Sequence, residues 1–132
     1  MLRLEIVTPE KRVLDAEVDS VTVPTASGEA GILPHHAPLV SALKPGVLVY
    51  SVKGSTDRIA VSGGFVEVNN DKVAVLVDTA ETAAEIDTAI ARSDRESAEK
   101  TVSSAGVLTA EEAEAARENV DLADARLAVG GR

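Results

Sequence analysis

The sequence contains no cysteine and no tryptophan, and only one tyrosine and one phenylalanine. Without cysteine the chain has no disulfide framework, no thiolate nucleophile and no Cys-based zinc or iron–sulfur site. Because aromatic side chains are scarce, any hydrophobic core must be built from Val, Leu, Ile and Ala. Such residues favour strands where Val and Ile cluster and helices where Ala clusters.

Basic side chains are also in the minority, with 13 Lys and Arg against 22 Asp and Glu and a net charge of -9. Long-range repulsion therefore argues against nucleic acid or an anionic membrane surface as a partner. No run approaches the roughly 18 apolar residues of a membrane span, and the start lacks the basic head and apolar stretch of a signal peptide. We expect a soluble protein that contacts a membrane only through its partners.

Residues 1–84 show the alternating pattern of β-strands. Apolar Leu2, Leu4 and Ile6 alternate with polar residues, and the turn signals Lys44-Pro45-Gly46 and Asn69-Asn70-Asp71 separate β-rich runs. Short strands at intervals of about 8 to 12 residues predict an antiparallel β-sandwich or flattened barrel of about eight to ten strands.

Residues 85–132 have the composition of helices, because alanine dominates and proline is absent. We predict one helix from near Asp87 to residues 103–106. A second helix opens with the capping box Thr109–Glu112, runs to about Ala128 and stops at Gly130-Gly131. A short linker between two helices makes an antiparallel hairpin, so the predicted fold class is α+β.

The apolar seam predicted for this hairpin is thin. The seam residues are Ala113, Ala116, Val120, Ala123 and Leu127 in the second helix and Ile86, Ile90, Ala98 and Val102 in the first. Each missing methylene forgoes about 0.8 kcal/mol of burial, so the hairpin must lean on something larger. The hairpin is also the more acidic part: residues 1–80 carry 7 basic and 10 acidic side chains, a net charge of -3, whereas the remainder carries 6 and 12, a net charge of -6.

A search for catalytic and metal-binding patterns yields no site. His35 and His36 are adjacent, so on an extended strand they point to opposite faces and cannot chelate one ion without a bend. Ser62 lacks the preceding glycine of a nucleophile elbow, and Gly28 and Gly31 precede no Lys-Ser or Lys-Thr pair. Many hairpin carboxylates wrap around their helix as a solvated face does; among them are Glu111, Glu112, Glu114 and Glu118. We predict no catalytic residue, no metal and no cofactor.

The stretch Ser27–Leu39 remains unexplained by these patterns. It combines glycine and proline with the apolar Ile32, Leu33 and Leu39 in what we expect to be an exposed connection. The residues alone leave two interpretations open, a docking loop for another protein or a tight structural crossover.

The same stretch carries a family resemblance. Gly28-Glu29-x-Gly31-Ile32-Leu33-Pro34-x-His36-Ala37-Pro38-Leu39 resembles the most recognisable segment of the epsilon subunits of F-type ATP synthase. Lys44-Pro45-Gly46, Ser62-Gly63-Gly64-Phe65-x-Glu67-Val68 and Val75-Leu76-Val77-Asp78-Thr79-Ala80-Glu81 follow in that family's order. The match covers the sandwich almost entirely and the hairpin in layout only.

The resemblance implies a ten-stranded sandwich with a C-terminal helical hairpin, acting as a non-catalytic rotor subunit of the central stalk. Its partners would be the gamma subunit and the membrane ring of c subunits, with the catalytic alpha/beta head reached if the hairpin extends. Carried over by position, the docking residues for the c ring are Gly28, Glu29, Gly31, Ile32, Leu33, Pro34, His36, Ala37, Pro38 and Leu39. The chain would sit at the cytoplasmic face of the bacterial plasma membrane and help to couple proton translocation to ATP synthesis.

The hairpin departs from the family pattern at one position. Some bacterial members bind ATP through an Ile-Asp-x-x-Arg-Ala motif, and here Ile90 stands where the arginine belongs. Glu81, Asp87 and Arg126 still fit a nucleotide site, but without that cation we predict weak or no ATP binding. Since the hairpin is acidic, we also predict that it inhibits ATP hydrolysis weakly.

Two other interpretations compete with the rotor subunit. One is a small-molecule or metal-binding β-sandwich protein that uses Glu29, His35 and His36. The other is a generic adaptor unrelated to rotary enzymes. Stoichiometric metal would support the first, and a partner set without gamma would support the second.

Overall fold

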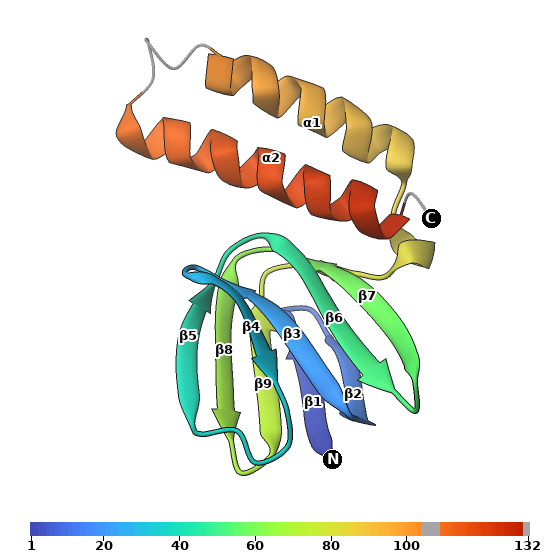
Figure 1. The fold of residues 1–132 in the computed structure, drawn as a ribbon. Coiled ribbons are helices and arrows are strands. Elements are labelled where there is room, and N and C mark those ends of the chain that lie inside the picture. Colours follow the sequence, from blue (N-terminus) through green and yellow to red (C-terminus); the bar gives the residue numbers. More distant parts are fainter. Residues whose placement is uncertain (104–108, 131–132) are drawn as a thin grey trace.

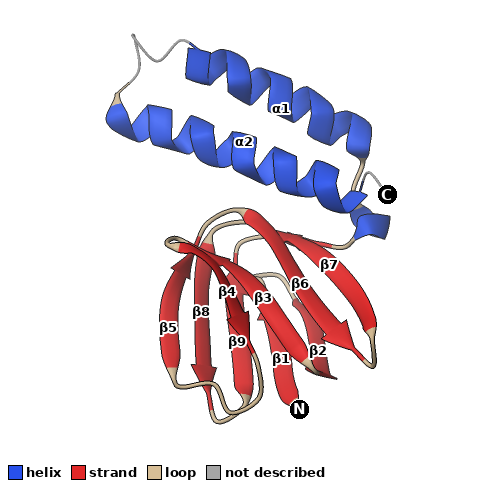
Figure 2. Ribbon diagram, viewed as in Figure 1, coloured by secondary structure: helices blue, strands red, loops and turns tan. Residues whose placement is uncertain are grey.

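The structure is a computed structural model that describes residues 1–103 and 109–130, and it shows a β-sandwich beneath a pair of helices (Figures 1 and 2). The strands are β1 (Leu2–Val7), β2 (Arg12–Val18), β3 (Ser20–Thr25), β4 (Gly28–Ile32), β5 (Leu39–Leu43), β6 (Gly46–Val52), β7 (Ser55–Val61), β8 (Gly64–Asn69), β9 (Lys72–Val77) and β10 (Ala80–Glu81). The predicted α+β class is confirmed, with ten strands among the described residues.

The strands form one hydrogen-bonded sheet in the order β10-β7-β6-β3-β5-β8-β9-β1-β2, with β4 paired to β3. Neighbours in this sheet are antiparallel with one exception, since β1 runs parallel to β9. This one parallel pair departs from the otherwise antiparallel sandwich that was predicted. The cause is that β1, the last strand but one in this order, lies between its antiparallel hairpin partner β2 and the distant β9.

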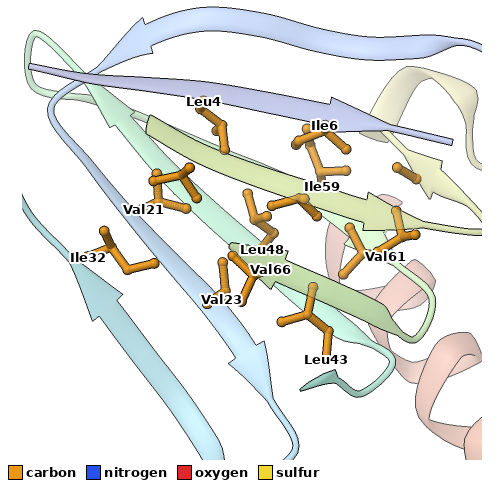
Figure 3. Close-up of a cluster of buried hydrophobic side chains, with 14 of the residues drawn as sticks. Leu4, Ile6, Val21, Val23, Ile32, Leu43, Leu48, Ile59, Val61 and Val66 are labelled. Carbon is orange, nitrogen blue, oxygen red and sulfur yellow. The ribbon is translucent and has the colours of Figure 1, made fainter. Parts of the chain in front are cut away.

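The hydrophobic core lies where the sheet folds over on itself (Figure 3). The alternation in β1 works as predicted, because Leu2, Leu4 and Ile6 are each 0% exposed while their polar neighbours face outward. Leu48 and Ile59 from β6 and β7 reach the same interior. The core consists of aliphatic side chains, as the shortage of aromatic residues requires.

The two long helices begin with side-chain caps. In α1 (Thr88–Ser103), the Asp87 carboxylate accepts the backbone N–H groups of Ala89 at 3.0 Å and Ile90 at 3.1 Å. In α2 (Ala110–Gly130), the Thr109 hydroxyl accepts the N–H of Glu112 at 3.1 Å, and the Glu112 carboxylate accepts the N–H of Thr109 at 3.4 Å. The predicted capping box is confirmed. The stops predicted at residues 104–106 and at Gly131 lie outside the described residues.

The helices meet through small side chains. Ala91 and Ala98 of α1 are buried, as are Ala116 and Ala123 of α2. Ile90, predicted in this seam, is instead 53% exposed, because Asp87 sets the start of α1 and turns Ala91 inward.

A different face of α2 rests on the sandwich. Ala125 and Val129 pack against Ala60, with Val47 and Ile86 at the border of this small cluster. Ile86 follows a short 3-10 helix, η1 (Ala83–Glu85), which connects β10 to α1. The hairpin therefore does lean on a larger unit, as its thin seam predicted.

Candidate docking surfaces

The stretch predicted as one docking loop has three parts in the structure. Gly28–Ile32 is strand β4, residues 33–38 form a turn, and Leu39 begins β5. The turn between β3 and β4 lies at the end of the sandwich that faces the helices, and the turn at residues 33–38 lies at the opposite end (Figure 1). The motif thus runs the height of the sandwich and offers two separate ends for docking.

The helix-facing end presents Glu29. Gly28 adopts φ 123°, a value that side chains disfavour, and its carbonyl accepts the Thr25 hydroxyl. This turn holds Glu29 exposed, and the carboxylate has no ion pair within residues 1–103 and 109–130. A hollow of about 390 Å³ separates Glu29 and Lys44 from α2.

The opposite end is fixed by a carboxylate from another turn. His35 has φ 67°, and its backbone N–H donates to Asp71 Oδ1 at 2.6 Å. The N–H of His36 donates to the Leu33 carbonyl at 3.2 Å, and Leu33 itself is 62% exposed. Asp71 was not predicted as part of this turn, because it lies 36 residues away along the chain.

Ile32 does not belong to either exposed end. It is 0% exposed and packs in the sandwich core, so the prediction of an exposed docking side chain is wrong here. The reason is the alternation of β4, which turns Ile32 inward while Glu29 and Gly31 face solvent.

The metal-binding alternative required Glu29, His35 and His36 to converge. Glu29 and Ile32 alone are separated by about 10 Å of extended strand, and the histidines lie beyond Ile32 at the far end. Across the part of the chain that the structure describes, no three His, Cys, Asp or Glu side chains gather to hold a metal ion. The structure therefore does not bring these candidate ligands together.

The outer face of β5, β8 and β9 carries three large exposed apolar side chains. Val40 is 72% exposed, Phe65 60% and Leu76 54%, and Phe65 lies directly beside Leu76 in the strand register. We call these three residues the apolar strip. These three exposed side chains were not predicted from the sequence, although Val66 and Val68 in the core place Phe65 on the opposite face by alternation.

Charged side chains cover the neighbouring part of the same face. Arg3 Nη2 lies 3.0 Å from Asp15 Oδ2, and Lys72 Nζ lies 3.3 Å from Glu5 Oε1. The hydrogen bond from Arg3 lowers the pKa of Asp15. These charges are paired within the chain, whereas the apolar strip has no cover in the described residues.

The three residues predicted for nucleotide binding are only partly assembled. Arg126 Nε lies 2.9 Å from Glu81 Oε1, an ion pair whose angle is too bent for a hydrogen bond. Arg126 Nη1 also donates to Asp94 Oδ2 at 3.3 Å. Asp87 is occupied with the cap of α1. Glu81 and Arg126 are thus brought together, while Asp87 serves another purpose.

Comparison with known proteins identifies the family. The sequence profile described as "ATP synthase, Delta/Epsilon chain, beta-sandwich domain" matches residues 1–83. The chain belongs to the ATP synthase epsilon family. As an epsilon chain it is a non-catalytic stalk subunit and not itself an enzyme.

Relatives of known name agree over most of the chain. An ATP synthase epsilon chain of Desulforamulus reducens is 52% identical over 104 residues, which is 79% of each chain. One from Desulfitobacterium hafniense is 44% identical over 126 residues, covering 96% of this epsilon chain and 86% of the relative. The second match extends the relationship into the hairpin.

Solved structures share the fold. A chain of the Euglena gracilis mitochondrial ATP synthase, in a structure of OSCP, F1 and the c ring, superposes with a TM-score of 0.80 at 25% identity, covering 96% of this chain and 79% of the other. A chain from the central stalk and c ring of the Tetrahymena thermophila enzyme reaches a TM-score of 0.64 at 17% identity, covering 98% and 96%. Among the described residues of this epsilon chain, neither helix has the length and hydrophobicity to cross a membrane.

Proposed function

We propose that this epsilon chain is a rotor subunit that links gamma to the c ring and so helps to couple proton translocation to ATP synthesis. Its similarity to a chain in an assembly of F1 and the c ring supports this function. The relatives in Desulforamulus reducens and Desulfitobacterium hafniense support a place at the cytoplasmic face of a bacterial plasma membrane, peripheral and within the complex.

The apolar strip is the observation that carries the proposal. Three large apolar side chains on neighbouring strands, each more than half exposed, form a surface that a partner would cover. The strip lies on the rigid sheet, so little conformational entropy is lost when it docks. We assign this face to gamma.

We assign the Glu29 end of the sandwich to the c ring. The glycine at position 28 holds the carboxylate in the open, where it can meet basic residues. The turn at residues 33–38, with the exposed Leu33, is then a second contact within the same assembly.

The test is a substitution in the apolar strip. We expect Phe65→Ser to abolish co-purification of gamma with the epsilon chain from membranes, because the side chain is 60% exposed and its loss removes contact area without opening the core. The matched control is Ile90→Ser on α1, where the side chain is 53% exposed. If the Phe65→Ser chain still co-purifies with gamma, the assignment is wrong. It is also wrong if only the Ile90→Ser chain loses gamma.

We further propose that the hairpin neither binds ATP tightly nor strongly inhibits hydrolysis. Arg126 is already paired with Glu81 and Asp94, and Asp87 is already a helix cap, so these groups are committed within the chain. Isothermal titration with ATP should show no binding in the micromolar range. A micromolar dissociation constant would overturn this part of the proposal.

A further inference from the structure

Strand β4 has one free edge. It pairs with β3 along its whole length, from Thr25 opposite Gly28 to Val21 opposite Ile32, and with no other strand of the described residues. The opposite edge of β3 is occupied by β5 and β6. A strand added to this part of the sheet would therefore have to join at β4.

A proline in β3 determines which backbone groups of β4 face this edge. Pro24 has no N–H, and its carbonyl accepts the N–H of Lys44 at 3.0 Å, so its polar groups point away from β4. Glu29 lies opposite Pro24, and in antiparallel pairs the hydrogen-bonded positions alternate. The N–H and C=O groups of Glu29 and Gly31 therefore point outward, while those of Ala30 point to β3.

The two terminal strands of the main sheet path are protected against strand addition. At the β2 edge, charged residues such as Arg12 and Asp15 and a register shift beside Val7 discourage pairing. At the other end, β10 has only two residues. The β3–β4 ladder has an unbroken register, and β4 contains neither proline nor lysine.

Gly31 leaves this edge accessible. Its φ is not in the left-handed region, and a Cβ added there would meet no atom within 4 Å. The glycine is therefore not required by turn geometry or by packing against this chain. Glycine in a strand commonly marks a close approach of another backbone, and here that backbone would belong to a partner.

We propose that the β4 edge receives an extended segment of a neighbouring subunit, which pairs with Glu29 and Gly31 through main-chain hydrogen bonds and places a lysine or arginine beside Glu29. The Glu29 carboxylate, unpaired in the described residues, selects a basic segment. A second copy of the chain is disfavoured, because each copy carries a net charge of -9 and would bring another Glu29 to the pair. This inference rests on the proposed function, since the segment belongs to the assembled enzyme.

Hydrogen exchange of single backbone amides tests the pairing directly. In the free chain we expect the amides of Glu29 and Gly31 to exchange without protection, and those of Ala30 and Ile32 to be protected by β3. In the assembled ATP synthase all four should be protected. If Glu29 and Gly31 stay unprotected in the assembled enzyme, the strand addition is wrong. If they become protected in the free chain at high concentration, the occupant is a second copy and the basic partner is wrong.

Substitutions separate the backbone contribution from that of the charge. Gly31→Pro removes the outward N–H and places the proline ring at the β4 edge, but it breaks no hydrogen bond to β3. We therefore expect nearly unchanged thermal stability, as proline is tolerated on edge strands, but rebinding to epsilon-depleted enzyme weakened by about ten-fold or more. Gly31→Ala keeps that N–H and should bind as the parent chain does. Glu29→Gln should weaken binding, whereas Glu10→Gln, an exposed carboxylate in the β1–β2 turn, should not. Equal binding by Gly31→Pro and Gly31→Ala would overturn the pairing.

The two levels of the proposal fail in different ways. If neither gamma nor the c ring co-purifies with the parent chain, the proposed function itself is wrong. If both co-purify but the Glu29 and Gly31 amides stay unprotected in the assembled enzyme, the proposed function stands and only the strand addition is wrong.

Discussion

The sandwich and the hairpin are held together by different means. The sandwich buries large aliphatic side chains completely, with Leu4, Ile6 and Leu48 each at 0% exposure. The hairpin buries mainly alanine, as at Ala98 and Ala123. Because burial free energy scales with apolar area, the sandwich carries its own stability, whereas the hairpin depends on its support.

Polar contacts supply part of what the hairpin lacks. Arg126 of α2 joins Glu81 of β10 and Asp94 of α1, so one side chain ties three elements. Lys11 in the sandwich pairs with Glu85 of η1 at 3.5 Å. Contacts of this kind break more readily than a packed core does, so we expect the hairpin to loosen before the sandwich unfolds.

The largest effect should come from truncating the sandwich core. Leu48→Ala is expected to lower the free energy of unfolding by about 2 to 5 kcal/mol, because the surrounding sheet cannot close the cavity. Leu127→Ala removes the same atoms from a half-buried position in α2 and should cost less than half as much. Urea unfolding of both variants measures the difference. If both variants lose the same free energy of unfolding, the two regions are not stabilised differently.

Removing the ion pairs of Arg126 should have a smaller and more local effect. Arg126→Gln is expected to destabilise the docked hairpin by about 1 to 2 kcal/mol, since it leaves Glu81 and Asp94 without their cation. The readout is faster amide exchange in α2 with unchanged exchange in β1. Arg117→Gln, an exposed arginine of the same helix, is the control. The same acceleration in both variants would show that Arg126 has no special position.

Acid should act weakly on the connector between the regions. The backbone N–H of Thr82 donates to the Glu85 carboxylate and lowers its pKa below the ordinary 4.5. A depressed folded-state pKa gives stability that is present above pH 4.5 and is lost as the pH falls through the folded value. We therefore expect Glu85→Gln to lower the urea midpoint slightly at pH 7 and to match the parent chain near pH 3. If Glu85→Gln lowers the urea midpoint more at pH 3 than at pH 7, the Glu85 carboxylate does not stabilise the fold in the way proposed.

The smallest effect should follow removal of the hairpin. If its acidic helices inhibit weakly, deletion of residues 88–132 should leave ATP hydrolysis by the assembled enzyme within about two-fold of the parent. The assay compares steady-state hydrolysis at saturating ATP. A large activation would show that the hairpin is an effective inhibitor despite its charge.

Local signals in the sequence predicted much of this architecture. The alternation of Leu2, Leu4 and Ile6 predicted a half-buried strand, and Thr109 with Glu112 predicted the start of α2, because both patterns depend on neighbours within a few residues. The change from β-branched residues to alanine likewise predicted two differently built regions.

Contacts between distant segments escaped prediction. Ile32 was expected on the surface because its glycine-rich surroundings suggested a loop, but pairing with β3 makes the segment a strand. The exposure of Phe65 and the free edge of β4 depend on which strands are neighbours, and periodicity does not specify that order. The packing of Ala125 and Val129 on the sandwich was not predicted, because α2 has one apolar side toward α1 and a second toward the sandwich.

The parallel pair formed by β1 and β9 has a consequence for the order of events during synthesis. β1 is the first strand to leave the ribosome, and it cannot pair with β9 until residues 72–76 have been synthesised. Closure of the sheet is thus a late, long-range step, which slows folding relative to a protein of local contacts. Until then β1 can pair only with β2. The native sheet of the nascent chain therefore forms when nearly all of the sandwich, but not yet the hairpin, has been synthesised.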